Sequence, residues 1–246
     1  MLRNQRLERH FVVDIKRHRR PVRRSREELL VGTVLILANG IWEDEAQARR
    51  LANSADLVIA ADGGFAKALA ARVHVDLVVG DLDSIDSAAC RAISASAVEV
   101  RRYPAAKDWS DLELALDEAL ARRPAEILIL GSLGHRIDHA LTNVHLLERG
   151  LGAGVAIELV DGTQSVILID ARHDVADAHV GDRVSLIPVS ESVRTTTSGL
   201  RFPLGDEILR RAASRGVSNV VDRLPVVIDV TSGRLLVIHD RPGAGS

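Results

Sequence analysis

Short apolar runs alternate with helical patterns from residue 31 to about residue 150. The runs are continuous in Val, Ile, Leu and Ala, which is typical of strands buried on both faces of a parallel sheet. The pattern predicts strands at 33–38, 56–61, 76–79, 98–102 and 127–130, and helices at 43–52, 65–71, 85–94, 110–122 and 137–148. Strands and helices in this order predict an α/β domain with helices on both faces of a parallel sheet.

The pattern changes after Gly150. Short β-type runs follow one another at 155–160, 165–169, 183–188, 193–197, 226–230 and 235–239, with turn signals such as Asp161-Gly162 between them. Runs of this kind predict an antiparallel sandwich or barrel. Three glycines lie within 150–154, so we expect the domain boundary there. The expected domains are therefore 31–150 and 151–246.

Charge divides the chain differently. The whole chain of 246 residues has a formal charge of −2. Residues 1–26 hold nine Arg and one Lys against two acids, a balance of +8, which leaves −10 for the remainder. We expect residues 1–30 to form a basic extension outside the folded domains. Alternatively, this basic extension is an arm that contacts RNA, a membrane surface or an acidic partner.

Composition excludes several classes of protein. A single cysteine, Cys90, excludes a disulfide framework and a multi-cysteine metal site. Aromatic residues make up 2% of the chain, too few for a base-stacking surface, so nucleic acid is not expected as the main partner. We find no apolar run long enough to span a bilayer and no secretory signal, so we expect a cytoplasmic protein that does not contact membranes.

Polar and glycine residues follow every predicted strand of the first half. In a parallel sheet of this type, ligands bind outside the carboxyl ends of the strands. The strongest group is Asp81-Leu82-Asp83, because two aspartates at i and i+2 can share one hard cation such as Mg²⁺. The alternative is a helix cap with solvated turn acids.

Three further groups lie at the same predicted edge. Lys107 to Asp111 offers a phosphate contact, a Ser110 cap and a third carboxylate, although Ser110 and Asp111 are also ordinary helix-start residues. Gly131 to His139 feeds a helix start, where backbone N–H groups and Arg136 can bind an anion, or where Asp138 simply caps the helix. Asp62-Gly63-Gly64 permits close approach of a ligand or forms an ordinary turn. The chain has no Walker A, GxGxxG or GxSxG sequence.

Taken in order, these groups resemble the motifs of the thiamine pyrophosphokinase family. That family has an Asp-Gly-Gly turn, a Gly-Asp-x-Asp-Ser loop, a Ser/Thr-Asp helix start and a Gly-x-x-Gly-x-Arg-x-Asp-His loop. The second half is also similar to the family's substrate domain. The matching blocks there are 185–188, 195–202 and 218–219.

The resemblance implies a Rossmann-like ATP-binding domain at 31–150, a β-sandwich that binds thiamine at 151–246, and a homodimer with thiamine at the subunit interface. It implies transfer of the pyrophosphoryl group of ATP to the hydroxyl of thiamine, giving thiamine diphosphate and AMP. The implied catalytic and Mg²⁺-binding residues are Asp81, Asp83 and Asp111. The implied ATP-binding residues are Asp62, Gly63, Gly64, Lys107, Ser110, Gly131, Arg136 and Asp138. The implied thiamine-binding residues are Thr197, Phe202, Ser218 and Asn219.

Two alternatives stay open. One is a diphosphokinase that acts on another alcohol, such as a hydroxymethylpterin, on the same scaffold. The other is a nucleotide-binding protein of the same fold without catalysis, which predicts loss of one or more of the three metal-binding aspartates. All three are present.

Overall fold

The computed structural model describes residues 31–82, 91, 93, 98–104, 106, 108–134 and 136–242. The predicted basic extension and most of the predicted helix at 85–94 lie outside these residues. In the described part of the chain, no helix combines the length and the apolar character needed to cross a lipid bilayer.

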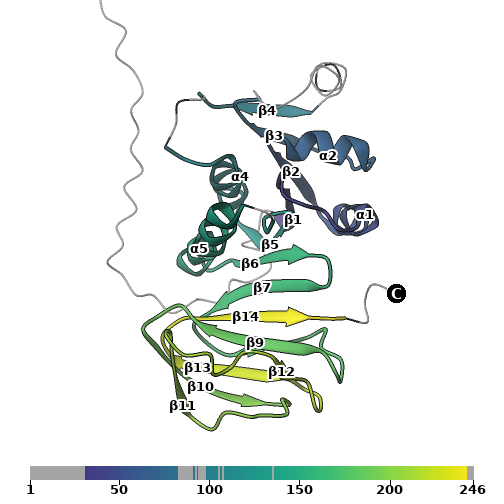
Figure 1. Ribbon diagram of the computed structural model, residues 1–246. Coiled ribbons are helices and arrows are strands. Elements are labelled where there is room, and N and C mark those ends of the chain that lie inside the picture. The colour runs from purple at the N-terminus through teal and green to yellow at the C-terminus, as the bar shows by residue number, and fades with distance from the viewer. Residues whose placement is uncertain are drawn as a thin grey trace, which may run out of the picture.

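One long sheet runs through the molecule, and its first half is parallel (Figure 1). Strands β4, β3, β2, β1, β5 and β6 lie side by side in that order, all parallel. Their bounds are β1 Val31–Leu37, β2 Leu57–Ala61, β3 Leu77–Gly80, β4 Glu99–Arg102, β5 Pro124–Leu130 and β6 Ala156–Asp161. The predicted parallel sheet is confirmed.

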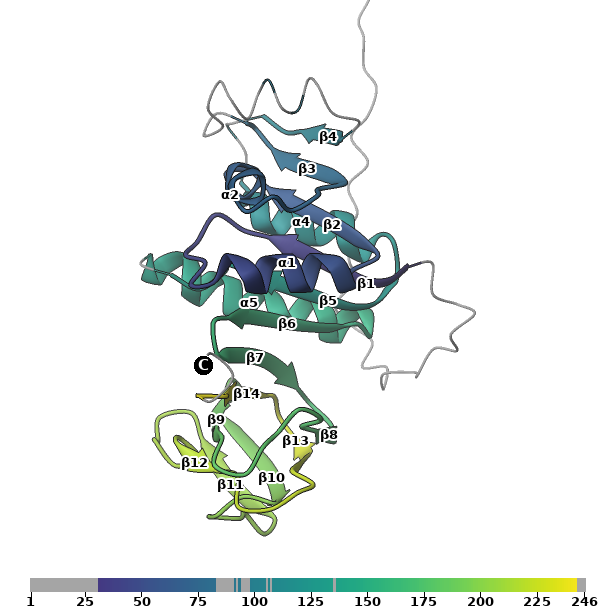
Figure 2. The same cartoon turned by 90° about the vertical axis from the view of Figure 1, so that its right-hand side faces the viewer.

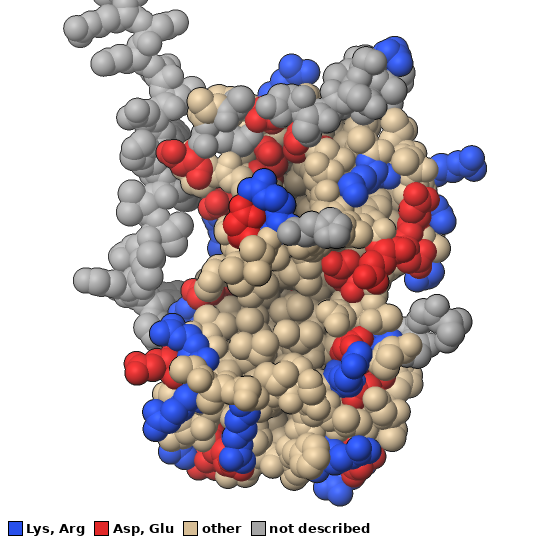
Figure 3. Space-filling model, in the orientation of Figure 1, with Lys and Arg blue, Asp and Glu red and all other residues tan. Residues whose placement is uncertain are grey.

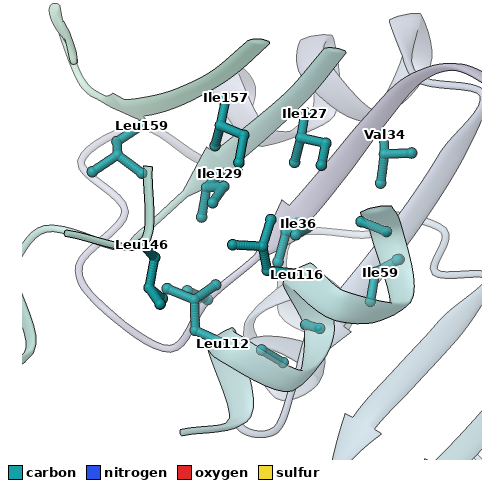
Figure 4. Packing of buried hydrophobic residues seen from close by; sticks show 14 of the residues in the cluster. Val34, Ile36, Ile59, Leu112, Leu116, Ile127, Ile129, Leu146, Ile157 and Leu159 are labelled. Atoms are coloured by element: carbon teal, nitrogen blue, oxygen red, sulfur yellow. The ribbon is translucent and has the colours of Figure 1, made fainter. Parts of the chain in front are cut away.

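Helices cover both faces of this parallel half. α1 (Glu45–Ser54) and α2 (Gly64–Ala70) lie on one face, and α4 (Asp111–Leu120) and α5 (Ile137–Ala153) lie on the other (Figures 1 and 2). Figure 4 shows Leu112 and Leu116 of α4 and Leu146 of α5 packed against the aliphatic side chains of the strands. The inner strands β2 and β3 are almost completely buried and apolar, whereas the edge strand β4, Glu99–Arg102, is mostly exposed and polar.

Side chains fix where the helices α1 and α4 begin. Asp44 caps α1 by accepting hydrogen bonds from the backbone N–H groups of Ala46 and Gln47. Ser110 caps α4, and its Oγ accepts from Glu113 N at 3.1 Å. These bonds satisfy N–H groups that have no partner inside the helix. The first residue of α4 is therefore Asp111, which places its carboxylate at the carboxyl edge of the sheet.

The second half is a sandwich of two antiparallel sheets. The long sheet continues as β6, β7, β14, β9 and β12, and a four-stranded sheet β11-β10-β13-β8 packs against it. Their bounds are β7 Gln164–Ile169, β8 His173–Asp174, β9 Arg183–Pro188, β10 Ser192–Ser198, β11 Glu207–Arg210, β12 Asn219–Val220, β13 Val227–Ser232 and β14 Leu235–Asp240. Alternate residues of β10 are buried, and the apolar residues of both sheets form one core.

Two parts of the second half differ from the predicted pattern. The run at 155–160 pairs in parallel with β5, because α5 serves as the crossover of a β5-α5-β6 unit. Pairing turns antiparallel only at β7.

The short strands β8, β11 and β12 were not predicted, since two to four residues carry no clear alternation. The sheet has no break at 150–154, where Gly154 ends α5 with a φ of 68°. The division into two domains stays a prediction.

Strands β7 and β14 belong to two cores at once. Val166, Leu168 and Leu236 pack in the core that α4 and α5 cover. Their neighbours Ile169, Leu235 and Val237 face the sandwich core instead. These two strands are therefore a wall shared by both halves of the molecule.

Candidate active site

A cavity of about 510 Å³ opens at the carboxyl edge of the parallel sheet. The turns after β1 and β2, the start of α4, the loop after β5 and the first turns of α5 enclose it. Of the residues expected to bind ATP or metal, it brings together Asp62, Ser110, Asp111, Gly131 and Arg136. These five residues come from three separate segments, the turn after β2, the start of α4 and the loop between β5 and α5, so the topology of the sheet gathers them.

Asp62 and Asp111 both lie against Gly80 at the end of β3. A Cβ placed on Gly80 would lie 3.1 Å from Oδ1 of Asp111 and 3.1 Å from Cβ of Asp62. Asp62 has a φ of 45°, a conformation that Asp tolerates better than most residues, and its N–H donates to Val79 O at 2.8 Å. The end of β3 therefore lies directly between two acids.

Asp81 follows Gly80 but does not line the cavity. The next residue, Leu82, has a φ of 65°, unusual for a bulky side chain, and is held there by a side chain buried in the core on the α1 and α2 face. Backbone strain of this kind gathers at functional sites. Asp83 and Lys107 lie outside the described residues.

The acids of this edge suit a hard cation. Carboxylate oxygens are the ligands that Mg²⁺ prefers, and Asp62 and Asp111 flank the strand that leads into Asp81. Among the described residues, no three acidic, His or Cys side chains are grouped closely enough to hold a metal ion. Asp83 lies outside the described residues, so the predicted metal-binding set of Asp81, Asp83 and Asp111 stays a prediction.

The loop after β5 supplies the opposite wall. Gly131 accepts a hydrogen bond from Gly40 N at 2.8 Å, which ties this loop to the turn after β1. Gly131 has a φ of 72°, and a Cβ there would collide with the indole of Trp42. Glycine is required here by both the backbone conformation and the close packing.

Arg136 and Asp138 form an ion pair at the mouth of the cavity. Arg136 Nε donates to Asp138 Oδ1 at 3.0 Å. This hydrogen bond lowers the pKa of the Asp138 carboxyl well below its ordinary value. Asp138 does not line the cavity itself. Its contact with the site is the hydrogen bond from Arg136.

Gly63 and Gly64 lie outside the cavity lining as well. A Cβ on Gly64 would collide with the backbone O of Leu37, and one on Gly63 would collide with the Asn39 side chain. Their smallness lets α2 start close against β1. A direct role for them in ATP binding stays a prediction.

Sequence reasoning missed Lys67 and left Asn143 out of the predicted site, and both residues line the cavity. Lys67 lies on α2, one turn beyond the predicted Asp62-Gly63-Gly64 group, a spacing that was available as a signal. Asn143 is buried on α5, and its Nδ2 donates to Ser132 O at 2.7 Å.

A second cavity, of about 380 Å³, lies in the sandwich, and Phe202 and Asn219 line it. The Phe202 side chain is 66% exposed. Asn219 Nδ2 donates to Phe202 O at 2.8 Å, and its Oδ1 accepts from Phe202 N at 3.1 Å. Asn219 therefore fixes the backbone that presents the aromatic ring.

Thr197 and Ser218 do not line this second cavity. Thr197 is buried, and its Oγ1 accepts from Leu204 N at 2.9 Å. Ser218 has a φ of 59°, and its N–H donates to Ser185 Oγ at 2.9 Å. Both residues shape the loops around Phe202, and contact with substrate stays a prediction for them.

Comparison with known proteins matches both halves of the chain. The family model described as "Thiamin pyrophosphokinase, catalytic domain" matches residues 48–159, and "Thiamin pyrophosphokinase, vitamin B1 binding domain" matches residues 167–235. The thiamine pyrophosphokinase of Bacillus subtilis is 31% identical over 185 residues, which cover 74% of this chain and 86% of that protein. The chain belongs to the thiamine pyrophosphokinase family.

Solved structures of thiamine pyrophosphokinases have the same fold. The crystal structure from Bacillus subtilis has a TM-score of 0.77 and 28% sequence identity, over 85% of this chain and 99% of that one. The Candida albicans structure has a TM-score of 0.73 at 13% identity, over 86% and 90% of the two chains, and supports the fold alone. The predicted α/β domain followed by a β-sandwich is thus the architecture of the family.

Proposed function

We propose that the protein transfers the pyrophosphoryl group of ATP to the hydroxyl of thiamine, giving thiamine diphosphate and AMP. The observation that carries this proposal is the cavity at the sheet edge, in a chain of the thiamine pyrophosphokinase family. It combines carboxylates, cations and a glycine loop at a helix start. Pyrophosphoryl transfer needs positioning and charge neutralisation more than covalent help from the protein.

The polyphosphate of ATP would lie between the acids and the cations of this cavity. Asp81, Asp83 and Asp111 would hold Mg²⁺, which when bound neutralises phosphate charge. Lys67 lines the same cavity and offers a point charge to a phosphate. Arg136 would exchange part of its pairing with Asp138 for a phosphate oxygen, since guanidinium groups bind both kinds of anion in the same forked geometry.

Thiamine would contact Phe202 in the sandwich. Its pyrimidine ring stacks on an aromatic face, and the exposed Phe202 ring offers one. The two cavities share no lining residue, which supports a homodimer in which the sandwich of one subunit faces the ATP cavity of the other. On the face drawn in Figure 3, the sandwich half of the molecule has a broad area free of Lys, Arg, Asp and Glu, as an interface between subunits would need.

Incubation of the full chain with ATP, Mg²⁺ and thiamine tests the proposal. Thiamine diphosphate and AMP should appear in equal amounts. ADP in place of AMP would contradict pyrophosphoryl transfer and indicate simple phosphorylation. Product from a hydroxymethylpterin, with none from thiamine, would favour the alternative substrate.

A further inference from the structure

Asn143 lies deep in the wall of the ATP cavity. It is 7% exposed and follows His139, which also lines the cavity, by one helical turn. It lies six residues beyond Ile137, the first residue of α5, which is about 9 Å along the helix axis. Asn143 is therefore well separated from the helix start, where an anion binds best.

The hydrogen bond to Ser132 fixes which way the amide faces. A backbone carbonyl can only accept, so the group at 2.7 Å from Ser132 O must be the amide nitrogen of Asn143. Oδ1 then points away from that carbonyl. No donor from the described residues lies within hydrogen-bond distance of Oδ1. In the same part of the chain, Oδ1 is also not one of the unpaired side-chain oxygens that are completely buried. The cavity wall thus presents a fixed acceptor.

An acceptor in this position selects one part of a nucleotide. Phosphate oxygens are acceptors and carry negative charge, so they have nothing to donate to Oδ1. The donors of ATP are its 6-amino group and its ribose hydroxyls. Asp62, Asp111 and Lys67, the groups suited to a metal–polyphosphate unit, come from the β2 turn, α4 and α2, whereas Asn143 comes from α5.

We propose that Asn143 is a specificity-determining residue whose Oδ1 accepts a hydrogen bond from an N–H or O–H donor of the nucleoside part of ATP. The polyphosphate then lies toward Asp62, Asp111 and the start of α5 at Arg136, and the nucleoside toward Asn143 on the second turn of α5. This inference rests on ATP as the co-substrate in the proposed function.

Calorimetric titration with Mg²⁺ and no thiamine tests it. ATP is compared with 2′-deoxy-ATP, 3′-deoxy-ATP and purine riboside triphosphate, which lacks the 6-amino group. One of the three analogues should bind the unmodified protein about tenfold more weakly than ATP, as expected for loss of one hydrogen bond in a cavity. The analogue that loses affinity identifies the donor. Equal binding of all four nucleotides would overturn the inference.

Two variants connect that discrimination to Asn143. Asn143→Leu should bind ATP and the critical analogue equally, because the Oδ1 acceptor is lost. His145→Ala, an exposed position on the same helix, is the matched control and should discriminate as the unmodified protein does. Survival of the discrimination in Asn143→Leu, or its loss in His145→Ala, would contradict the assignment. If ATP itself does not bind, the proposed function fails instead.

Discussion

The two cavities of this molecule are built by different means. At the edge of the parallel sheet, Asp62, Ser110 and Gly131 come together because each follows a strand or starts a helix at the same end of the sheet. In the sandwich, Phe202 takes its place because the side chain of Asn219 binds its backbone on both sides. Topology positions the first site, and individual hydrogen bonds position the second.

This difference decides how each site responds to substitution. A residue at the sheet edge is held by strands whose apolar side chains are fully buried, so its side-chain chemistry can change while the backbone stays in place. A loop that is held by one side-chain amide changes its conformation when that single residue is replaced. The predictions that follow test the two sites separately and then the region where they join.

The largest effect is expected at the sheet edge. Asp111→Asn should lower kcat by about 10²–10³-fold, because a charge that stabilises the transferring group is removed. The melting temperature should stay close to that of the unmodified protein, since the Ser110 cap is untouched. Asp117→Asn, on the same helix but paired with Arg149, is the control and should keep its activity. Full activity of Asp111→Asn would remove this residue from the catalytic set.

A smaller effect is expected in the sandwich. Phe202→Ala should raise the KM for thiamine about tenfold and leave the KM for ATP unchanged, because a stacking face is lost only on the thiamine side. Steady-state kinetics with each substrate varied in turn measures both constants. Ile208→Ala removes another exposed apolar side chain of the sandwich and should change neither constant. Equal increases in both KM values would break the separation between the sites.

The smallest effect is expected where the two halves join. Asp161 ends β6, and desolvation, with the nearby charge of Glu43 adding to it, raises its pKa from 3.8 to about 6. The folded protein then holds this proton more tightly than the unfolded chain does, so stability falls as pH rises from about 4 to about 6. Asp161→Asn removes the charge and should raise stability above pH 6 by about 1 kcal/mol after solvent screening is allowed for.

Thermal melts from pH 4 to pH 8 measure this. The difference between Asp161→Asn and the unmodified protein should vanish near pH 4 and reach about 2–4 °C at pH 8. Glu43→Gln should produce a smaller gain in the same direction, since the charge of Glu43 is the lesser cause. A difference that stays constant with pH would contradict titration of Asp161 as its cause.

Much of the fold could be predicted from the sequence, because buried parallel strands leave unbroken apolar runs. The run at 33–38 became β1, and the Ser110 cap placed the start of α4. The parallel pairing of β6 was missed because the domain boundary was expected at 150–154. The predicted helix at 137–148 lies between two predicted strands, and this order already favours a β5-α5-β6 unit with parallel strands.

The site was predictable where residue type alone carries chemistry, as for Asp62 and Asp111. It was less predictable where a residue acts through its neighbours. Thr197 and Asn219 bind backbone groups of the loop that carries Phe202, and these contacts depend on how that loop folds. Lys67 lies on α2 one turn beyond the predicted Asp62-Gly63-Gly64 group, so its position in the cavity could have been predicted from that spacing.

The wall shared by β7 and β14 has a consequence for how the protein loses its structure. Neither half keeps a closed core once these strands leave, because Leu168 and Leu236 complete one core while Ile169 and Leu235 complete the other. Heat or denaturant should therefore unfold the parallel half and the sandwich in a single cooperative transition. Catalytic capacity and thiamine affinity should disappear together, and a chain cut at the glycines near residue 150 should yield an N-terminal fragment that does not fold alone, because β7 and β14 stay with the other fragment.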